Sequence, residues 1–226
     1  MARRTLGRVP RLSLRVKHDG SVVVSASKHF SDQDVLDWVS KKADWIYKHL
    51  NRMSQYKEKD VPLRYEHGET HRYLGKRYVL NVMEDAQCLP KVHLKQGKLS
   101  VTVRKQSAEK VKKLLHEWYK ERALEVFSRR LTEVLPKVPW VSKLPVFRIV
   151  AMKSRWGSCS SQNRITLNLH LIKAPQECID YVWLHELCHI AEHNHSQRFY
   201  DLMDQVMPDW RVVKMRLQEL ERLLLK

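Results

Sequence analysis

Two histidines four residues apart, His185 and His189, stand in an apolar stretch of the chain that follows Pro175. Proline is favoured in the first turn of a helix, so we predict a helix that runs through residues 178–190. Side chains four residues apart project from the same face of a helix. Both imidazoles can therefore reach one metal ion, with the carboxylate of Glu186 beside them.

The residues that precede His185 make this predicted helix apolar on most of its sides, so we expect it to be buried. They are Ile179, Tyr181, Val182, Trp183 and Leu184. A buried carboxylate and buried imidazoles are costly unless they have partners. A metal ion is the simplest partner, and Glu186 can then accept a proton from water. A helix that only contains two hydrogen-bonded histidines is the alternative interpretation.

A third histidine is expected to complete the metal site, and the sequence offers His193 and His195. On a continuous helix His193 would lie about 12 Å along the axis from His185, too far for metal–nitrogen distances of about 2.1 Å. If the helix instead ends near Asn194, in a left-handed cap, His195 can turn back to the metal. We therefore predict a zinc ion held by His185, His189 and His195, with water in the fourth position.

The rest of the chain predicts an α+β fold whose composition changes near Gln106. Before that residue, alternating apolar residues and turn residues indicate β-hairpins. They cover residues 11–25, 72–82 and 92–103. Ser31 is predicted to cap one helix in this part, and the apolar stripe of that helix places Trp38 and Trp45 in its core.

Helices dominate after Gln106, beginning with a long one from Ser107 to about Leu135. Short strands are expected over residues 146–152 and 164–169, and later helices after Ser196 and after Pro208. This pattern divides the chain into two regions. The first is rich in β-hairpins over residues 1–106, and the second is a helical metal-binding region with a small sheet over residues 107–226.

The chain carries 42 Lys and Arg residues against 25 Asp and Glu residues, a formal net charge of +17. Such a surplus attracts nucleic acid and phosphorylated ligands, although a solvated basic surface without a dedicated partner explains it equally. No apolar run approaches the roughly 20 residues that a membrane helix needs. Four cysteines without a CxxC pair, and an N-terminal stretch without an apolar core, favour a cytoplasmic protein.

A polar, basic segment over residues 153–159 lies between the two predicted strands of the second region. Lys153 and Arg155 can bind an anionic group of a substrate or stabilise an oxyanion. The alternative is a loop that is held in place by packing of Trp156 and by a turn at Gly157.

The motifs of this sequence resemble those of the YgjP-like metal-dependent hydrolases, which are relatives of the WLM and SprT-like metallopeptidases. The resemblance covers most of the chain. The matching motifs are Tyr73–Lys76, Lys153–Cys159, Asn168–Leu169, Tyr181–Val182, His185–His189, Asn194–Ser196 and Phe199. The stretch from His185 to His195 also resembles the long zinc motif of metzincin peptidases, except that Glu192 stands where they carry glycine.

This resemblance implies a zincin-like fold for the second region, with Glu186 as the general base. It also implies that an edge strand aligns an extended peptide, for which residues 164–168 are the candidate. Asn168 on that strand then joins Lys153, Arg155 and Trp156 as a candidate substrate-binding residue.

Three functions remain open from the sequence. Hydrolysis of peptide bonds is favoured, because a metal-polarised carbonyl and a water activated by Glu suit this set of residues. Hydrolysis of a nucleoside triphosphate or another phosphate anhydride is the second, motivated by Lys153, Arg155 and the net charge. The third is a nucleic-acid-binding module with a structural metal, although a structural zinc has no use for Glu186 between two ligands.

Overall fold

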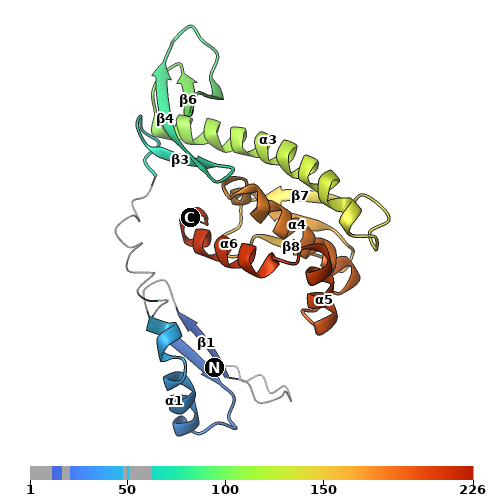
Figure 1. Ribbon diagram of the computed structural model, residues 1–226. Helices are drawn as coiled ribbons and strands as arrows, with labels where there is room; N and C mark the ends of the chain where they lie inside the picture. The colour runs from blue at the N-terminus through green and yellow to red at the C-terminus, as the bar shows by residue number, and fades with distance from the viewer. Residues whose placement is uncertain (1–11, 17–20, 48–49, 51–62, 226) are drawn as a thin grey trace. The chain divides into compact units, whose positions relative to one another are not determined.

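The computed structural model describes residues 12–16, 21–47, 50 and 63–225 (Figure 1). The fold is α+β, as the sequence predicts. The chain forms two compact units, Met1–Leu63 and Arg64–Lys226, which are described separately below. This division precedes the predicted boundary at residues 106–107, because the sheet before that point and the long helix after it share one hydrophobic core.

The first unit contains a hairpin and a short helix. Strands β1 (Leu12–Val16) and β2 (Val22–Ala26) pair in antiparallel fashion, and the turn predicted between them lies outside the described residues. Helix α1 (Asp32–Ser40) begins at the predicted cap. The Ser31 hydroxyl accepts a hydrogen bond from the Asp34 backbone N–H at 3.1 Å, and the Asp34 carboxylate accepts one from the Ser31 N–H at 2.9 Å.

The core role predicted for Trp38 and Trp45 is wrong. No residue of α1 is buried, and Trp45, which lies beyond the end of that helix, is 49% exposed. Among the described residues of this unit, a two-stranded hairpin, a nine-residue helix and a short helical stretch over residues 43–47 offer too little apolar surface to enclose a core.

The second unit begins with a four-stranded sheet. Its strands are ordered β3 (Thr70–Tyr73), β4 (Lys76–Glu84), β6 (Lys98–Val103) and β5 (Lys91–Lys95). The predicted hairpin segments form here, although β4 and β6 pair in parallel while the outer pairs are antiparallel. One face of this sheet packs against the long helix α3 (Ala108–Val134), which forms as predicted.

A second, three-stranded sheet lies further along the chain. Its order is β7 (Phe147–Val150), β9 (Ile165–Asn168) and β8 (Gly157–Cys159), so β9 is the central strand. The prediction that residues 164–168 form an edge strand is therefore wrong. The edge strand next to α4 is β8, which forms within the segment whose alternative interpretation was a loop.

Helix α4 (Gln176–Ala191) lies at the centre of the second unit. It contacts α3, β8, α5 (Gln197–Val206) and α6 (Trp210–Leu224), so it is buried on nearly all sides, as predicted. Two 3₁₀ segments complete the unit, η1 (Leu135–Lys137) after α3 and η2 (Leu169–Lys173) before α4. Among the described residues, no helix is long and apolar enough to cross a membrane.

The turn between β3 and β4 is fastened to the start of α4. The backbone N–H of Leu74 donates to the carbonyl of Ile172 at 2.9 Å, and that of Gly75 donates to the carbonyl of Lys173 at 3.1 Å. Gly75 has φ of +77°, and a Cβ at this position would lie 2.9 Å from Cγ of Pro175. We call this contact the turn clasp. It needs glycine both for its conformation and for its close approach.

We expect Gly75→Ala to destabilise the protein by about 1–3 kcal/mol, because alanine is strained at positive φ and its Cβ would also meet Pro175. Gly97→Ala is a matched control, since Gly97 has φ of +75° and no atom within 4 Å of the added Cβ. Thermal unfolding of the two variants measures their losses of stability. The difference between these losses is the part that comes from the contact with Pro175, because the backbone strain is common to both variants. An equal loss of stability in both variants would show that the turn clasp contributes nothing.

Candidate metal centre

Three histidine side chains come together at one end of α4. His185 and His189 project from the same face of the helix, and His195 follows on the segment that leads to α5. One nitrogen atom of each imidazole lies within 4.8 Å of the other two. The Nε2 atoms of His185 and His195 face each other at 3.3 Å. The structure thus brings together the three residues that the sequence proposed as metal ligands.

The chain reaches this arrangement because α4 ends close to the end of the predicted range, 178–190. The helix ends at Ala191, and Glu192 is already extended, with φ of −144° and ψ of 102°. The predicted left-handed cap at Asn194 is wrong, because this residue does not have positive φ. The extended Glu192 redirects the chain so that His195 returns to the helix, while His193 is exposed and is not part of the cluster.

Neighbouring groups orient the three rings. Nδ1 of His189 donates to the carbonyl of Glu192 at 3.0 Å, which leaves its Nε2 available as a ligand. The ring of Phe199 packs against all three imidazoles, with centroid distances of 5.0, 4.6 and 4.7 Å to His185, His189 and His195. Phe199 is placed by the start of α5, where the predicted cap at Ser196 is present.

The electrostatic environment keeps the imidazoles neutral. Burial lowers the pKa of His185 to about 3, and the nearby His189 and His195 act in the same direction. Burial also lowers the pKa of His189. Neutral imidazole is the form that binds a metal ion, so this donor set fits a divalent cation such as zinc.

Glu186 is buried next to this cluster with only 4% of its surface exposed. Within the part of the chain that the structure describes, its Oε2 atom has no hydrogen-bond partner. Burial raises the pKa of this carboxyl to about 8, although the charge of Arg155 opposes the shift. A buried carboxylate oxygen without a partner is costly, and a nearby cation or a water molecule would relieve that cost.

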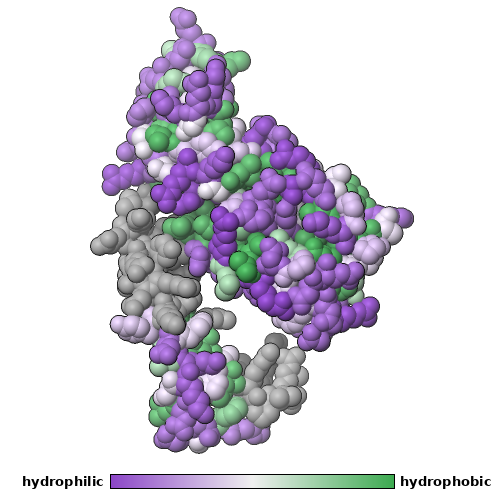
Figure 2. Space-filling view, in the orientation of Figure 1, coloured by the Kyte–Doolittle hydropathy of each residue, from purple (hydrophilic) through white to green (hydrophobic). Residues whose placement is uncertain are grey.

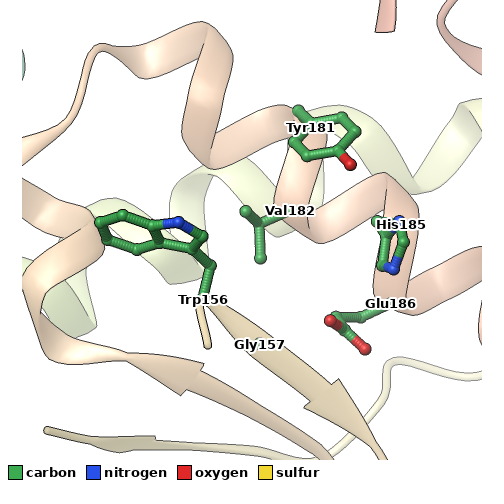
Figure 3. A pocket seen from close by; sticks show the side chains of 6 residues that line it. All are labelled: Trp156, Gly157, Tyr181, Val182, His185 and Glu186. Carbon is green, nitrogen blue, oxygen red and sulfur yellow. The ribbon is translucent and has the colours of Figure 1, made fainter. Parts of the chain in front are cut away.

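A pocket of about 160 Å³ opens beside Glu186, between α4 and β8 (Figure 3). Its lining residues are Trp156, Gly157, Tyr181, Val182, His185 and Glu186. Gly157 allows the strand to approach the helix closely, since a Cβ there would lie 2.6 Å from Oε1 of Glu186 and 3.0 Å from Cγ1 of Val182. The pocket therefore presents Glu186 and one edge of the histidine cluster to a substrate.

We expect Gly157→Ala to displace the Glu186 carboxylate. The backbone conformation at Gly157 is compatible with alanine, but the added Cβ would overlap with the Glu186 side chain. Because Glu186 lines the pocket, hydrolytic activity should fall about 10-fold or more, while metal content is retained. Turnover and metal content of the purified variant measure these effects. Ser158→Ala on the same strand adds no atom and serves as the control. Full activity of Gly157→Ala would contradict the role assigned to this close contact.

The candidate substrate-binding residues have different surroundings. Trp156 lines the pocket, whereas Lys153 and Arg155 are exposed and do not belong to its lining. Arg155 is close enough for its charge to act on Glu186. Sequence reasoning did not identify Gly157 and Tyr181 as pocket residues. From the residues themselves Gly157 was interpreted as a turn residue and Tyr181 as one of several apolar positions on the helix, although both lie in motifs that carry the family resemblance.

Asn168 has a structural position instead of the predicted substrate contact. It is fully buried, and its Nδ2 donates to the carbonyls of Met152 at 2.8 Å and Arg155 at 2.7 Å. Its Oδ1 accepts from the backbone N–H groups of Met152 at 3.2 Å and His170 at 3.0 Å. The amide group of Asn168 is thus occupied by backbone groups of the protein, and these hydrogen bonds hold the 152–155 loop beside the pocket.

The α+β fold and the cluster of three imidazoles beside a buried carboxylate are those of a metal-dependent hydrolase. The family model described as "YgjP-like, metallopeptidase domain" matches residues 10–220, and the chain belongs to this family. The family resemblance seen in the sequence motifs is thereby confirmed, and with it the assignment of the chain as an enzyme of the metallopeptidase class. Among curated proteins, none matches this sequence.

Two solved structures show partial similarity to this chain. The metallopeptidase zymogen of Pyrococcus abyssi abylysin is 21% identical over 40% of this chain and 90% of its own, with a TM-score of 0.37. The metallopeptidase zymogen of Methanocaldococcus jannaschii jannalysin is 20% identical over 41% of this chain and 94% of its own, also with a TM-score of 0.37. Similarity at this level says nothing about activity, so the assignment rests on the family.

Proposed function

We propose that this protein hydrolyses peptide bonds with a zinc ion held by His185, His189 and His195, and with Glu186 as the general base. The observation that carries this proposal is the cluster of three imidazole nitrogens within 4.8 Å, next to a buried carboxylate that lines an open pocket. A module whose metal is only structural would gain nothing from Glu186 at this place.

A zinc ion held by the three histidines would supply a Lewis acid for the peptide carbonyl and would lower the pKa of a water molecule. A cation there would also favour the charged form of the neighbouring Glu186 carboxyl, which could then accept a proton from the attacking water. It then delivers the proton to the departing amine. Phe199 and the Glu192 carbonyl hold the ligand rings in place during this cycle.

We also propose that the substrate backbone pairs with β8. This strand lies at the edge of its sheet, and its first residue, Gly157, lines the pocket beside Glu186. An extended peptide can add to such an edge through main-chain hydrogen bonds. Trp156 is then placed to contact a substrate side chain, and the exposed Lys153 and Arg155 to contact acidic groups on the peptide.

The experiment that tests this function compares the zinc-loaded protein on two substrates, a casein-like peptide mixture and a set of nucleoside triphosphates. We expect peptide cleavage that is abolished by a chelator and restored by zinc, with no phosphate release above background. Phosphate release without peptide cleavage would overturn the proposal and favour the phosphate-anhydride alternative. Metal analysis of the same preparation should give one zinc per chain.

We propose that the protein is located in the cytoplasm. All four cysteines are free, and two of them, Cys178 and Cys188, are buried. Free buried thiols are usual in a reducing compartment, which supports this location.

A further inference from the structure

The sheet β3–β4–β6–β5 has a second face, opposite α3, which we call the outer face. Side chains alternate between the two faces of a strand. Four residues of the central strands are buried in the core shared with α3, and their register pairs them across the two strands. They are Leu80, Val82, Leu99 and Val101. The residues between them therefore belong to the outer face.

The outer face carries cations and no acidic residue. Its basic residues come from all four strands: Arg72, Arg77, Lys91, His93, Lys95 and Lys98. Its other positions are Thr70, Val79, Asn81, Met83, Ser100 and Thr102. The two hydroxyl residues on the central strand, Ser100 and Thr102, are 7% and 4% exposed. These two short side chains lie between Lys91 and His93 of β5 on one side and Asn81 and Met83 of β4 on the other.

Two pairs of like charges lie directly opposite each other on this face. Arg72 is opposite Arg77 across β3 and β4, and Lys95 is opposite Lys98 across β5 and β6. Burial and the charge of Arg77 both lower the pKa of Arg72, which shows that the first pair is close. Like charges in directly opposed positions destabilise a sheet.

Nothing in the described part of the chain compensates these charges. Salt bridges elsewhere in the second unit join Arg and Lys residues to carboxylates, but none of them includes a basic residue of the outer face. Among the acidic residues near this sheet, Glu69 is bound to His71, which belongs to the opposite face. Glu84, the last residue of β4, is paired with the core residue Val103, so it also belongs to the opposite face, and its carboxylate accepts from the N–H of Gln106. The carboxylate of Asp85, which follows β4, accepts from the N–H groups of Gln87 and Cys88. The outer face is therefore a surface of one sign, and an external anion would stabilise it.

We propose that the outer face binds the phosphate backbone of a nucleic acid. Successive same-face residues of a strand are about 6.8 Å apart and neighbouring strands about 4.8 Å apart, which presents cations as a regular array suited to repeated phosphates. Arginine, present as a cross-strand pair, suits phosphate in particular. Figure 2 shows hydrophilic residues, with hydrophobic ones between them, over the lobe that contains β4 and β6.

The side chains of this face favour nucleic acid over an acidic polypeptide. Protein interfaces are enriched in Tyr, Trp, Phe, Met and Arg and depleted in Lys and Ser. The outer face carries no Tyr, Trp or Phe, and its three lysines, Lys91, Lys95 and Lys98, outnumber its arginines and its one methionine taken separately. The same lack of aromatic residues removes a platform for stacking bases, so binding should be independent of base sequence. Since the face is separate from the histidine cluster, this inference does not depend on the proposed peptidase activity.

The test measures binding of the full-length protein to a fluorescein-labelled single-stranded oligonucleotide of mixed sequence by fluorescence anisotropy. The variant Arg77→Gln/Lys98→Gln removes one cation from each like-charge pair, and both side chains are exposed. The control Lys137→Gln/Lys143→Gln removes the same net charge from exposed positions outside this sheet. All measurements are repeated from low to high salt and with a chelator present.

We expect the outer-face variant to bind at least about 10-fold more weakly than the wild type, and the control less than about 2-fold more weakly. The slope of log affinity against log salt should fall by about 1.4 in the outer-face variant, the value for two lost phosphate contacts on a single strand. Affinity should not change with the chelator. The melting temperature of the variant should equal or exceed that of the wild type, because repulsion is relieved.

Three outcomes would overturn the inference. Equal weakening in both variants would show that only the overall charge attracts the oligonucleotide. Tighter binding of labelled poly-glutamate than of the oligonucleotide, lost in the outer-face variant alone, would assign the face to an acidic polypeptide. Wild-type affinity that does not respond to salt would exclude phosphate contacts. None of these results bears on peptide cleavage, which is measured separately.

Discussion

Substitution of Glu186 by glutamine is expected to lower the rate of peptide hydrolysis by at least about 100-fold, within the range that loss of a general base commonly costs. Glutamine keeps the size of the side chain but cannot accept the proton from the attacking water. The fold should be retained or slightly stabilised, since the variant no longer buries an ionisable carboxyl whose Oε2 lacks a hydrogen bond. Metal content should remain at that of the wild type, because the three imidazoles are unchanged.

The measurements are turnover, metal content and melting temperature of the same preparation. Glu177→Gln is the matched control, because Glu177 lies on the same helix but is paired with Arg216 away from the pocket. It should leave turnover unchanged. A metal-loaded Glu186→Gln protein with full activity would exclude the proposed base. Loss of metal together with activity would instead give Glu186 a structural role.

Replacement of His195 by alanine should remove the metal from the protein almost completely. His195 provides one of three ligand nitrogens and comes from outside α4, so its loss leaves only the two histidines of the helix. Loss of a residue that only hydrogen-bonds to a metal ligand can lower metal affinity by roughly 100-fold. Because His195 is itself a proposed ligand, we expect its loss to lower zinc affinity by more than that. Competition with a chromophoric chelator measures this affinity directly, without reference to activity.

His193→Ala is the control for this experiment. The side chain of His193 is only two residues away, is exposed and takes no part in the cluster. Zinc affinity of this variant should stay within about 3-fold of the wild type. This change is smaller than the change of about 10-fold or more that follows when a metal ligand loses its hydrogen-bonding partner. Equal losses at the two positions would show that the third ligand has been assigned wrongly.

The parts of the site that follow from local spacing could be predicted from the sequence. His185, Glu186 and His189 lie within two turns of one helix, and the helical period alone places both imidazoles on one face. The choice of His195 over His193 also followed from a distance, because a continuous helix carries the latter too far along the axis. The reason given for the helix end was nevertheless wrong, since an extended Glu192 turns the chain, not a left-handed Asn194.

The parts that depend on pairing between distant segments could not be predicted in this way. Strand β8 has three residues, too few to show an alternation of apolar and polar side chains. Without it, β9 could not be recognised as the central strand, and Gly157 could not be placed against Glu186. The same limit applies to Trp38 and Trp45, whose apolar spacing indicates a buried face only where another element covers it.

The turn clasp has a consequence for the design of a smaller enzyme. A fragment that starts at residue 107 would lose the N–H donors of Leu74 and Gly75, and the carbonyls of Ile172 and Lys173 just before the histidine-bearing helix would lose their partners. It would also uncover the side of α3 that now packs on the sheet. The shortest chain that preserves the histidine cluster should therefore start near Arg64 and should include the four-stranded sheet, which holds the start of this helix in place.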